Sequence, residues 1–323
     1  MSGLTFVDVC SGAGGLALGL ERAGFEPRLL LDEDADACWT LRANRPHWNV
    51  LRGDLLDLDP SEHPESYDVD LLSAGLPRVK SNATAARTES GQEERLLKAS
   101  VYLAHAVRPR ALLVENVPAL ADPDKFHHFH EFARAELEHL GYEFSWFVLN
   151  AADFGVPQDR KQGVLVAIKK QWFPSFRIPS PTVADHVSVG EVLAPSMRSR
   201  GWKDADRWAT QAASVAPTLV GGSKNRGGAD LGPAGTKRKW EKLGVNAHSL
   251  GDELPGPDFV WAPELGKDGM VRLTVNQAAL LQSFPKDWEI TGKKTARYRQ
   301  IGHASPPPVG EALGLAIAHA LRS

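Results

Sequence analysis

The sequence predicts an α/β protein with a doubly wound, mostly parallel sheet (a Rossmann-like fold) and a second, smaller and irregular domain. Two observations predict this architecture. Short apolar strands alternate with helical patterns over residues 1 to ~170, which is typical of a parallel sheet covered by helices. From Trp172 to about Met270, prolines and glycines are frequent and no sustained helical period is present, which indicates a separate domain.

The first strand and the turn after it are central to the prediction. Thr5–Val9 is a β-branched and aromatic run, and Gly12, Gly14 and Gly15 follow it before a leucine-rich helical pattern. A strand, a glycine-rich turn and a helix open a βαβ nucleotide-binding unit, in which free N–H groups at the helix N-terminus face the ligand. The spacing differs from G-x-G-x-x-G, which disfavours NAD as that ligand.

Acidic residues end the next two strands. Arg28–Asp32 is an apolar strand that places Asp32 where it can accept hydrogen bonds from a ribose. A helix is expected over Ala35–Asn44, and a third strand at Trp48–Leu51 leads to Asp54. Both carboxylates therefore lie at the carboxyl edge of the expected sheet, where ligands bind in open α/β folds.

The alternation continues through the rest of the first domain. The expected strands are Val69–Ser73, Ala111–Pro118, Phe144–Leu149 and Gly163–Ile168, and the expected helices are Leu96–Ala106 and Phe126–Leu140. The polar stretch Ser81–Glu94 is expected to be an exposed loop. Further helices are expected near the C-terminus, over Leu273–Leu281 and Val309–Leu321.

Composition limits the class of protein. A hydrophobic content of 42% with 24% charged residues is ordinary for a globular chain. Two cysteines, Cys10 and Cys38, cannot form a disulfide framework and suit a reducing compartment. No apolar run approaches the ~20 residues of a membrane span, and no signal-peptide pattern is present, so we expect a cytoplasmic protein without a membrane partner. Four histidines between His127 and His139 lack partners that would complete a metal site, and no metal is expected.

A local basic stretch stands out against the net charge of −3. It lies within Ser223–Lys242 and contains the candidate DNA-binding residues Lys224, Arg226, Lys237, Arg238 and Lys239. Basic side chains on a glycine-rich loop can neutralise backbone phosphates of nucleic acid. A solvated loop without a ligand is an equally good interpretation of the same residues.

Five motifs occur in order along nearly the whole chain. They are Asp8-Val-Cys-Ser-Gly-Ala-Gly-Gly15, Glu115-Asn116-Val117, Val156-Pro-Gln158-Asp-Arg160, Leu281-Gln282-Ser-Phe284-Pro285 and Ile301-Gly302-x-Ala304-x-Pro306-Pro307. In this order they resemble the motifs of the DNA cytosine-5 methyltransferases. The resemblance implies a domain that binds S-adenosylmethionine at residues 1–172, a target-recognition domain that binds double-stranded DNA at 173–268, and a segment at 269–323 that returns to the first domain.

The resemblance also assigns the cofactor site. S-adenosylmethionine would be held by the glycine-rich turn, by the acidic residues after the second and third strands, and by the last motif, in which His303 replaces the asparagine of the family. These residues are Asp8, Ser11, Gly12, Ala13, Gly14, Gly15, Asp32, Glu33, Asp54, Leu55 and His303.

The chemistry of the family needs a thiolate. It adds to C6 of a cytosine flipped out of the duplex, so that C5 can attack the methyl group of the cofactor. A glutamate, matched by Glu115, holds N3 and the exocyclic amine, and an arginine holds O2. In the loop Ala74-Gly-Leu-Pro-Arg-Val79, Arg78 stands where the family has its cysteine. A guanidinium stays protonated and cannot add to C6.

Two further departures from the family motifs, like Arg78, indicate loss of the family's reaction. Gln162 replaces the last arginine of Q-x-R-x-R, which the family uses on O2, and His303 replaces the asparagine of the last motif. Glu115 and Arg160 are retained, and we expect an ion pair between Glu115 and Arg78 to fill the pocket. The candidate residues at catalytic positions are Arg78, Glu115, Arg160 and Gln162.

Three functions are compatible with these residues. The first is a catalytically degenerate methyltransferase that binds S-adenosylmethionine and DNA as the partner of an active methyltransferase or a restriction protein, or as the DNA-recognition subunit of such a system. The second is an active cytosine-5 methyltransferase with an unmapped nucleophile, Cys10 or Cys38. The third is methyl transfer to another acceptor, bound by Arg78, Lys80 and Glu115.

Overall fold

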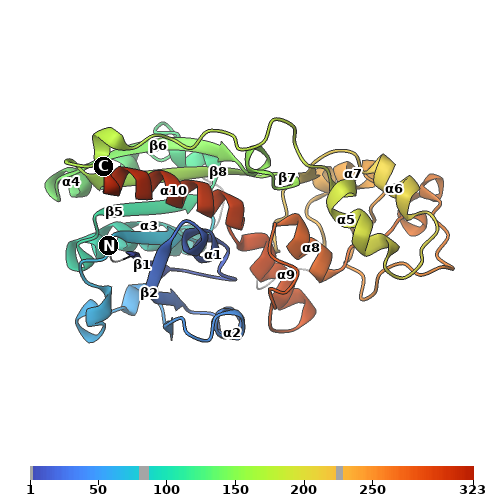
Figure 1. Ribbon diagram of the computed structural model, residues 1–323, viewed down its shortest axis with the longest axis horizontal. Helices are drawn as coiled ribbons and strands as arrows, with labels where there is room; N and C mark the ends of the chain where they lie inside the picture. The colour runs from blue at the N-terminus through green and yellow to red at the C-terminus, as the bar shows by residue number, and fades with distance from the viewer. Residues whose placement is uncertain (1–2, 80–86, 223–227) are drawn as a thin grey trace. The chain divides into compact units, whose positions relative to one another are not determined.

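The computed structural model describes residues 3–79, 87–222 and 228–323, and its elements are labelled in Figure 1. The chain forms two compact units. Unit 1 consists of Met1–Leu149, Lys161–Ser180 and Val309–Ser323, and unit 2 consists of Asn150–Arg160 and Pro181–Pro308. The expected C-terminal segment, 269–323, therefore divides between the two units, and only its last 15 residues belong to unit 1.

Unit 1 contains a seven-stranded sheet in the order β3-β2-β1-β4-β5-β8-β6. Its strands are β1 (Leu4–Val9), β2 (Phe25–Asp32), β3 (Val50–Arg52), β4 (Leu71–Gly75), β5 (Ala111–Asn116), β6 (Tyr142–Asn150) and β8 (Lys161–Lys169). The first five strands in this order pair in parallel, and β8 runs antiparallel to β5. This topology confirms the predicted doubly wound, mostly parallel sheet. The strand order reverses between β1 and β4, which is the point where open α/β sheets bind ligands.

Helices α1 (Gly15–Arg22), α2 (Ala35–Asn44), α3 (Arg87–Val107), α4 (His127–His139) and α10 (Pro307–Arg322) complete unit 1. In Figure 1, α10 runs beside α1. The two helices approach so closely that a Cβ on Gly310 would lie 2.9 Å from the Leu16 carbonyl oxygen. Val7 and Val9 of β1 pack with α3 and α4 in one core cluster, so Asp8 points to the opposite face of the sheet.

One expectation about unit 1 is wrong. The polar stretch 81–94 was expected to be a loop, but α3 begins at Arg87, and only residues 81–86 lie outside the described part of the chain. Gln92, Glu93 and Glu94 precede the buried Leu96 and Leu97. Glutamine and glutamate are good helix formers, so a polar stretch can form the exposed first turns of a helix whose later turns are buried.

Unit 2 is more helical than its composition indicates. It contains α5 (Val189–Arg198), α6 (Ala205–Gln211), α7 (Ala234–Lys242), α8 (Val275–Leu281) and α9 (Lys294–His303), with a small parallel pair of β7 (Gln158–Asp159) and β9 (Ala216–Pro217). The expectation of an irregular region from Trp172 to about Met270 is therefore wrong for α5, α6 and α7, because helices of 7 to 10 residues are too short to give a sustained period. Its core contains the buried tryptophans Trp202, Trp208, Trp240 and Trp261.

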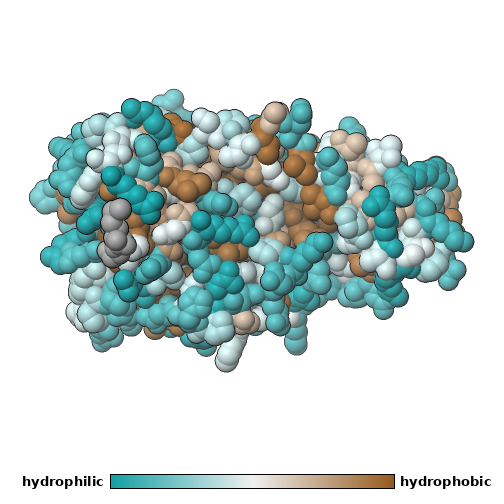
Figure 2. Space-filling model, in the orientation of Figure 1, coloured by the Kyte–Doolittle hydropathy of each residue, from teal (hydrophilic) through white to brown (hydrophobic). Residues whose placement is uncertain are grey.

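Apolar side chains are scattered over the surface. Figure 2 shows a face that is mostly hydrophilic with separate apolar patches, which is usual for a globular protein. No helix in the described part of the chain is both long enough and apolar enough to span a membrane.

Candidate functional site

The turn after β1 leaves the N-terminus of α1 open. Cys10, Gly12 and Gly14 all have positive φ, at 56°, 53° and 80°, and glycine adopts this region without strain. Gly14 is the N-cap of α1, and no side chain caps the helix there. A Cβ on Gly12 would meet no atom within 4 Å. The turn therefore offers uncapped backbone N–H groups beside open space, as a nucleotide-type ligand requires.

Asp32, at the end of β2, is tied to this turn. Its Oδ2 accepts the N–H of Gly12 at 2.7 Å, and its Oδ1 accepts the N–H of Asp34 at 2.8 Å. Burial raises the pKa of Asp32, and the two backbone hydrogen bonds act against that rise. The side chain thus holds the turn in place. Its contact with a ribose stays a prediction.

The other acidic residues of this edge differ in exposure. Glu33, which follows Asp32, is exposed. Asp54 caps the short helix Leu55–Asp57, because its Oδ1 accepts the N–H of Leu56 at 2.9 Å. Leu55 is buried. Glu33 follows β2 and Asp54 follows β3. These two strands pair side by side, so both residues lie at the same edge of the sheet, as the sequence predicts.

Asp8 and Ser73 form a buried pair at the switch point. Asp8 of β1 and Ser73 of β4 are directly opposite in the strand register, and neither is exposed to solvent. The Ser73 hydroxyl donates to Asp8 Oδ1 at 2.5 Å, whereas Asp8 Oδ2 has no hydrogen-bond partner among the described residues. Burial raises the pKa of Asp8 to about 7. Ser73 was not predicted as a site residue, because only the strand register brings it to Asp8.

The loop after β4 carries Arg78 and is held by one side chain. Asn116, which is 2% exposed, donates from Nδ2 to the carbonyls of Leu76 and Pro77 at 3.3 and 3.0 Å. Its Oδ1 accepts the N–H of Val79 at 3.0 Å. The backbone is therefore fixed on both sides of Arg78. Asn116 belongs to the Glu-Asn-Val motif, but its contact with this loop was not predicted.

Arg78 follows the strand β4, whose end lies beside Glu115 of β5. Gly75, at the end of β4, pairs with Glu115 of β5, so the loop begins beside this carboxylate. Arg78 is partly buried, and Glu115 is 7% exposed. Burial lowers the pKa of Arg78, whereas the charge of Glu115 raises it. A guanidinium stays protonated at neutral pH, so the loop after β4 carries a permanent cation. The ion pair expected between Arg78 and Glu115 stays a prediction.

Gln162 lies at the same edge of unit 1, and Arg160 lies in unit 2. Asn116 pairs with Gly163 in the antiparallel register of β5 and β8, which brings the buried Gln162 to the end of β5. Arg160 is 1% exposed, and its Nη1 donates to the carbonyls of Leu219 and Gly302, both at 3.0 Å. Within unit 2, Arg160 therefore links two chain segments through their backbones.

Gln158 and His303, which also belong to the motifs, form further hydrogen bonds within unit 2. Gln158 donates to Oε1 of Gln282 at 2.7 Å and accepts the N–H of Leu219 at 2.7 Å. His303 is exposed, and its Nε2 lies 3.2 Å from the carbonyl oxygen of Gly222. The described contacts of these residues are thus made inside unit 2. A contact between His303 and a cofactor stays a prediction.

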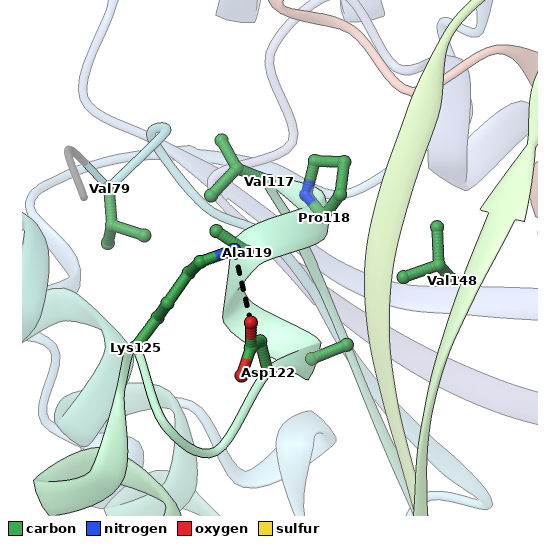
Figure 3. A pocket seen from close by; sticks show the side chains of 8 residues that line it. Val79, Val117, Pro118, Ala119, Asp122, Lys125 and Val148 are labelled. Carbon is green, nitrogen blue, oxygen red and sulfur yellow. Dashed lines mark ion pairs between the residues drawn. The ribbon is translucent and has the colours of Figure 1, made fainter.

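A hollow of about 590 Å³ lies beside the Arg78 loop in unit 1 (Figure 3). Six apolar residues and one ion pair line it, and Asp122 and Lys125 form that pair at 3.1 Å. The lining residues are Val79, Val117, Pro118, Ala119, Ala121, Asp122, Lys125 and Val148. Neither Arg78 nor Glu115 is among them, so the hollow is distinct from the position of these two charges.

The basic residues of unit 2 differ from one another. Lys237, Arg238 and Lys239 lie on α7, so the expectation of a loop is wrong for these three. Lys237 pairs with Asp230 at 2.8 Å, whereas Arg238 and Lys239 are exposed. Lys224 and Arg226 lie outside the described residues. Among the described candidates, Arg238 and Lys239 are therefore the ones with exposed cationic side chains that are not paired with Asp230.

The two cysteines are unsuited to nucleophilic attack. Cys38 is 1% exposed, and burial raises its pKa to about 11. Burial and the negative charge of Asp32 also raise the pKa of Cys10. A thiol attacks as its thiolate, so a raised pKa disfavours attack by either cysteine at neutral pH. Among the described residues, no group of three His, Cys, Asp or Glu side chains is arranged to hold a metal.

The doubly wound sheet and the open turn at its switch point define a Rossmann-like fold, and two solved methyltransferase structures share this fold. EhMeth, a methyltransferase of Entamoeba histolytica, superposes with a TM-score of 0.68 at 13% identity and covers 100% of both chains. The Dnmt2 methyltransferase of S. pombe superposes with a TM-score of 0.65 at 16% identity and covers 99% of both chains. At these identities the similarity concerns the fold alone.

The chain belongs to the C-5 cytosine-specific DNA methylase family, whose model matches residues 4–319. It is 42% identical to the Type II methyltransferase M.NaeI of Lentzea aerocolonigenes, over 99% of this chain and 76% of that protein. It is 38% identical to the Type II methyltransferase M.NgoMIV of Neisseria gonorrhoeae, over 98% of both chains. The resemblance seen in the sequence motifs is therefore confirmed.

Proposed function

We propose that this protein binds S-adenosylmethionine and duplex DNA but does not methylate cytosine by itself. It would act as the partner of an active methyltransferase or restriction protein, or as the DNA-recognition subunit of a modification or restriction system. One observation carries the proposal. Arg78, a permanent cation, stands on the loop after β4 where the family motif has its nucleophilic cysteine, and Asn116 holds the backbone on either side of it.

The electrostatics of the site support the loss of nucleophilic attack. Addition to C6 needs a group that can supply an electron pair, and a protonated guanidinium has none to supply. The pKa values of both cysteines are raised, which disfavours the thiolate at neutral pH. This counts against the alternative in which Cys10 or Cys38 replaces the missing thiol. At the position where the family has the O2-binding arginine, the neutral Gln162 would stabilise developing charge more weakly.

The turn after β1 fits the proposed cofactor. Its uncapped N–H groups, the open space at Gly12 and the acidic residues after β2 and β3 suit a nucleoside with a cationic amino-acid tail. Asp32 and Glu33 would hold the ribose, and Asp54 and Leu55 the adenine. Asp8 would supply negative potential beneath the cationic tail. When bound, S-adenosylmethionine carries a transferable methyl group, and this chain's residues hold and orient it.

Duplex DNA is proposed as the other ligand on the strength of family membership and of α7. Arg238 and Lys239 are exposed on this helix and can meet backbone phosphates, which contribute affinity without sequence readout. Lys237 contributes less, because Asp230 already neutralises it.

The proposal is tested with one preparation of purified protein. Calorimetry measures S-adenosylmethionine binding, and a labelled methyl group reports transfer to a cytosine-rich duplex. We expect binding without transfer. C5-methylcytosine formed by the protein alone would refute the proposal. A methylated product of another kind would favour the third function, transfer to a different acceptor. An Arg78→Cys variant in the same assay shows whether the missing thiol is the sole defect.

A further inference from the structure

Two aliphatic side chains of unit 2 extend into solvent from one short loop. Val260 is 77% exposed and Leu265 is 74% exposed, and no other large hydrophobic side chain among the described residues is as exposed as these two. Both lie in the loop formed by residues 258–269, five positions apart. Single exposed apolar residues are ordinary on a protein surface, whereas apolar side chains that gather on one element mark an interaction site.

The backbone at Val260 is fixed by its neighbours. Trp202 is buried, and its indole Nε1 donates to the carbonyl of Phe259 at 3.0 Å. Its ring packs edge-on against the rings of Phe259 and Trp261, with centroids 5.5 and 6.4 Å away. Trp261 is itself buried. Val260 is therefore held in an exposed position by the anchored residues on either side of it.

Leu265 lies on a closed turn of the same loop. The Ala262 N–H donates to the Gly269 carbonyl at 2.9 Å, which joins the two ends of the turn. A Cβ on Gly269 would collide with the Ala262 carbonyl oxygen, so only glycine permits this close approach. The buried Asn246 donates from Nδ2 to the Lys267 carbonyl at 2.8 Å. Because this backbone is ordered before a partner arrives, docking on the loop costs little conformational entropy.

The charge of the 258–269 loop decides between possible partners. Its exposed charged side chains are three acids and one lysine, a net charge of −2: Asp258, Glu264, Lys267 and Asp268. Arg207 lies over the Trp261 ring at 5.1 Å, but Asp204 lies 4.0 Å from it. A negative surface repels the phosphates of DNA. It attracts cationic side chains, so a protein segment that is both apolar and basic fits this loop.

We propose that the 258–269 loop is a docking site for a segment of a partner protein that combines apolar and basic side chains. The apolar side chains would pack on Val260 and Leu265, and lysine or arginine would face the acids beside them. This inference rests on the proposed function, which supplies a partner protein, and it adds the surface and the chemistry of that contact. Within unit 2, α7 would then meet phosphate and this loop would meet protein.

The first experiment selects the partner chemistry directly. A displayed library of short random peptides is selected on the whole wild-type chain, and peptides that also bind a Val260→Ser, Leu265→Ser double variant are removed. The remaining peptides should be rich in lysine and arginine together with leucine, phenylalanine or tryptophan. Acidic sequences, or the absence of any peptide that distinguishes the two proteins, would overturn the proposal.

Selected peptides are then titrated by fluorescence anisotropy. The double variant should bind them more weakly by about tenfold or more, because two anchors are lost, and a Glu264→Lys, Asp268→Lys variant should also bind more weakly. Leu315→Ser is the matched control, since Leu315 is 54% exposed on α10 of unit 1 and should leave the affinity unchanged. Weaker binding by Leu315→Ser, or unchanged affinity after the charge reversal, would overturn the proposal.

Two other occupants of the loop give different results. Sedimentation of the wild type and the double variant tests for a second copy of this chain, and anisotropy of a labelled duplex tests for DNA. We expect both proteins to have the same oligomeric state and the same affinity for the duplex. Self-association that the double variant loses would assign the loop to a second copy, and weaker duplex binding would assign it to DNA. Either result would overturn the proposal.

These measurements do not depend on methyl transfer, so the two proposals can fail separately. If no peptide distinguishes the wild type from the double variant, the docking site fails, whereas binding of S-adenosylmethionine and DNA without transfer would still support the proposed function. If the wild type methylates cytosine by itself, the proposed function fails, and the peptide titrations alone decide the docking site.

Discussion

Replacing Asp8 with asparagine should change how stability depends on pH. Asp8 is fully buried, and its pKa is raised from its ordinary 3.8 to about 7 by burial. A carboxyl that is easier to protonate in the folded chain than in the unfolded chain favours folding at low pH. Its contribution is complete below pH 3.8 and is lost as the pH rises through 7. A change of this size corresponds to about 4 kcal/mol at most.

The Asp8→Asn variant removes this loss, because the amide stays neutral and its oxygen can still accept from the Ser73 hydroxyl. The difference grows as the pH rises from 3.8 to 7, so we expect the variant to be more stable than the wild type by about 1–2 kcal/mol at pH 5 and by ~2–4 kcal/mol at pH 8. Urea unfolding at intervals between pH 5 and 8 measures the difference. Ser73→Ala removes a hydrogen bond that lowers the pKa of Asp8, so the loss of stability should move to higher pH.

Asp59 provides a matched control, since it is an exposed acid whose pKa is lowered by its hydrogen bonds to Ser61. Asp59→Asn should keep the wild-type loss of stability between pH 5 and 8. If Asp8→Asn shows the same pH dependence as the wild type, Asp8 is already ionised well below pH 7. The account of the buried pair at the switch point would then be wrong.

Other substitutions test the remaining parts of the site. Asn116→Ala should cost about 2–4 kcal/mol of unfolding free energy in a denaturant titration, because three backbone groups of the Arg78 loop lose their partner; a loss below ~0.5 kcal/mol would mean that the loop is held by other contacts. Asp32→Ala should weaken S-adenosylmethionine binding more than tenfold in calorimetry, through loss of the Gly12 hydrogen bond as well as any ribose contact; unchanged affinity contradicts this. Replacing both Arg238 and Lys239 by glutamate should reduce the salt dependence of duplex binding more than replacing Lys237 and one of these two residues by glutamate. Equal effects would show that the exposed pair does not contribute more phosphate contacts than Lys237.

The sequence predicts the parallel part of the sheet well because its signals are local. Apolar runs bounded by glycine or acidic residues locate β1, β2 and β5 to within a few residues. The start of α3 could not be predicted, because its first turns carry polar residues that suit a loop and an exposed helix equally. The helices α5, α6 and α7 of unit 2 escaped detection for a related reason: two to three turns give too few positions to show a period.

The site was predictable as a set of positions and not as a set of contacts. The motifs locate Asp8, Asp32 and Glu115, but the Ser73 hydroxyl reaches Asp8 across 65 residues of sequence. Only the register of parallel strands, which the sequence does not specify, brings these two groups together. The role of Asn116 is hidden in the same way, since its three hydrogen bonds run to a loop 37 to 40 residues earlier.

The most direct test of the account is whether the protein can form a covalent bond to cytosine C6. The purified chain is incubated with S-adenosylmethionine and a long duplex of mixed sequence in which 5-fluorocytosine replaces every cytosine, so that whichever cytosine is attacked carries the fluorine that traps the adduct. A thiolate attack would trap the protein on the DNA, visible as a band that survives denaturing electrophoresis. With Arg78 at the family's nucleophile position, we expect no such band. A stable adduct with the wild-type chain would show that another side chain performs the attack.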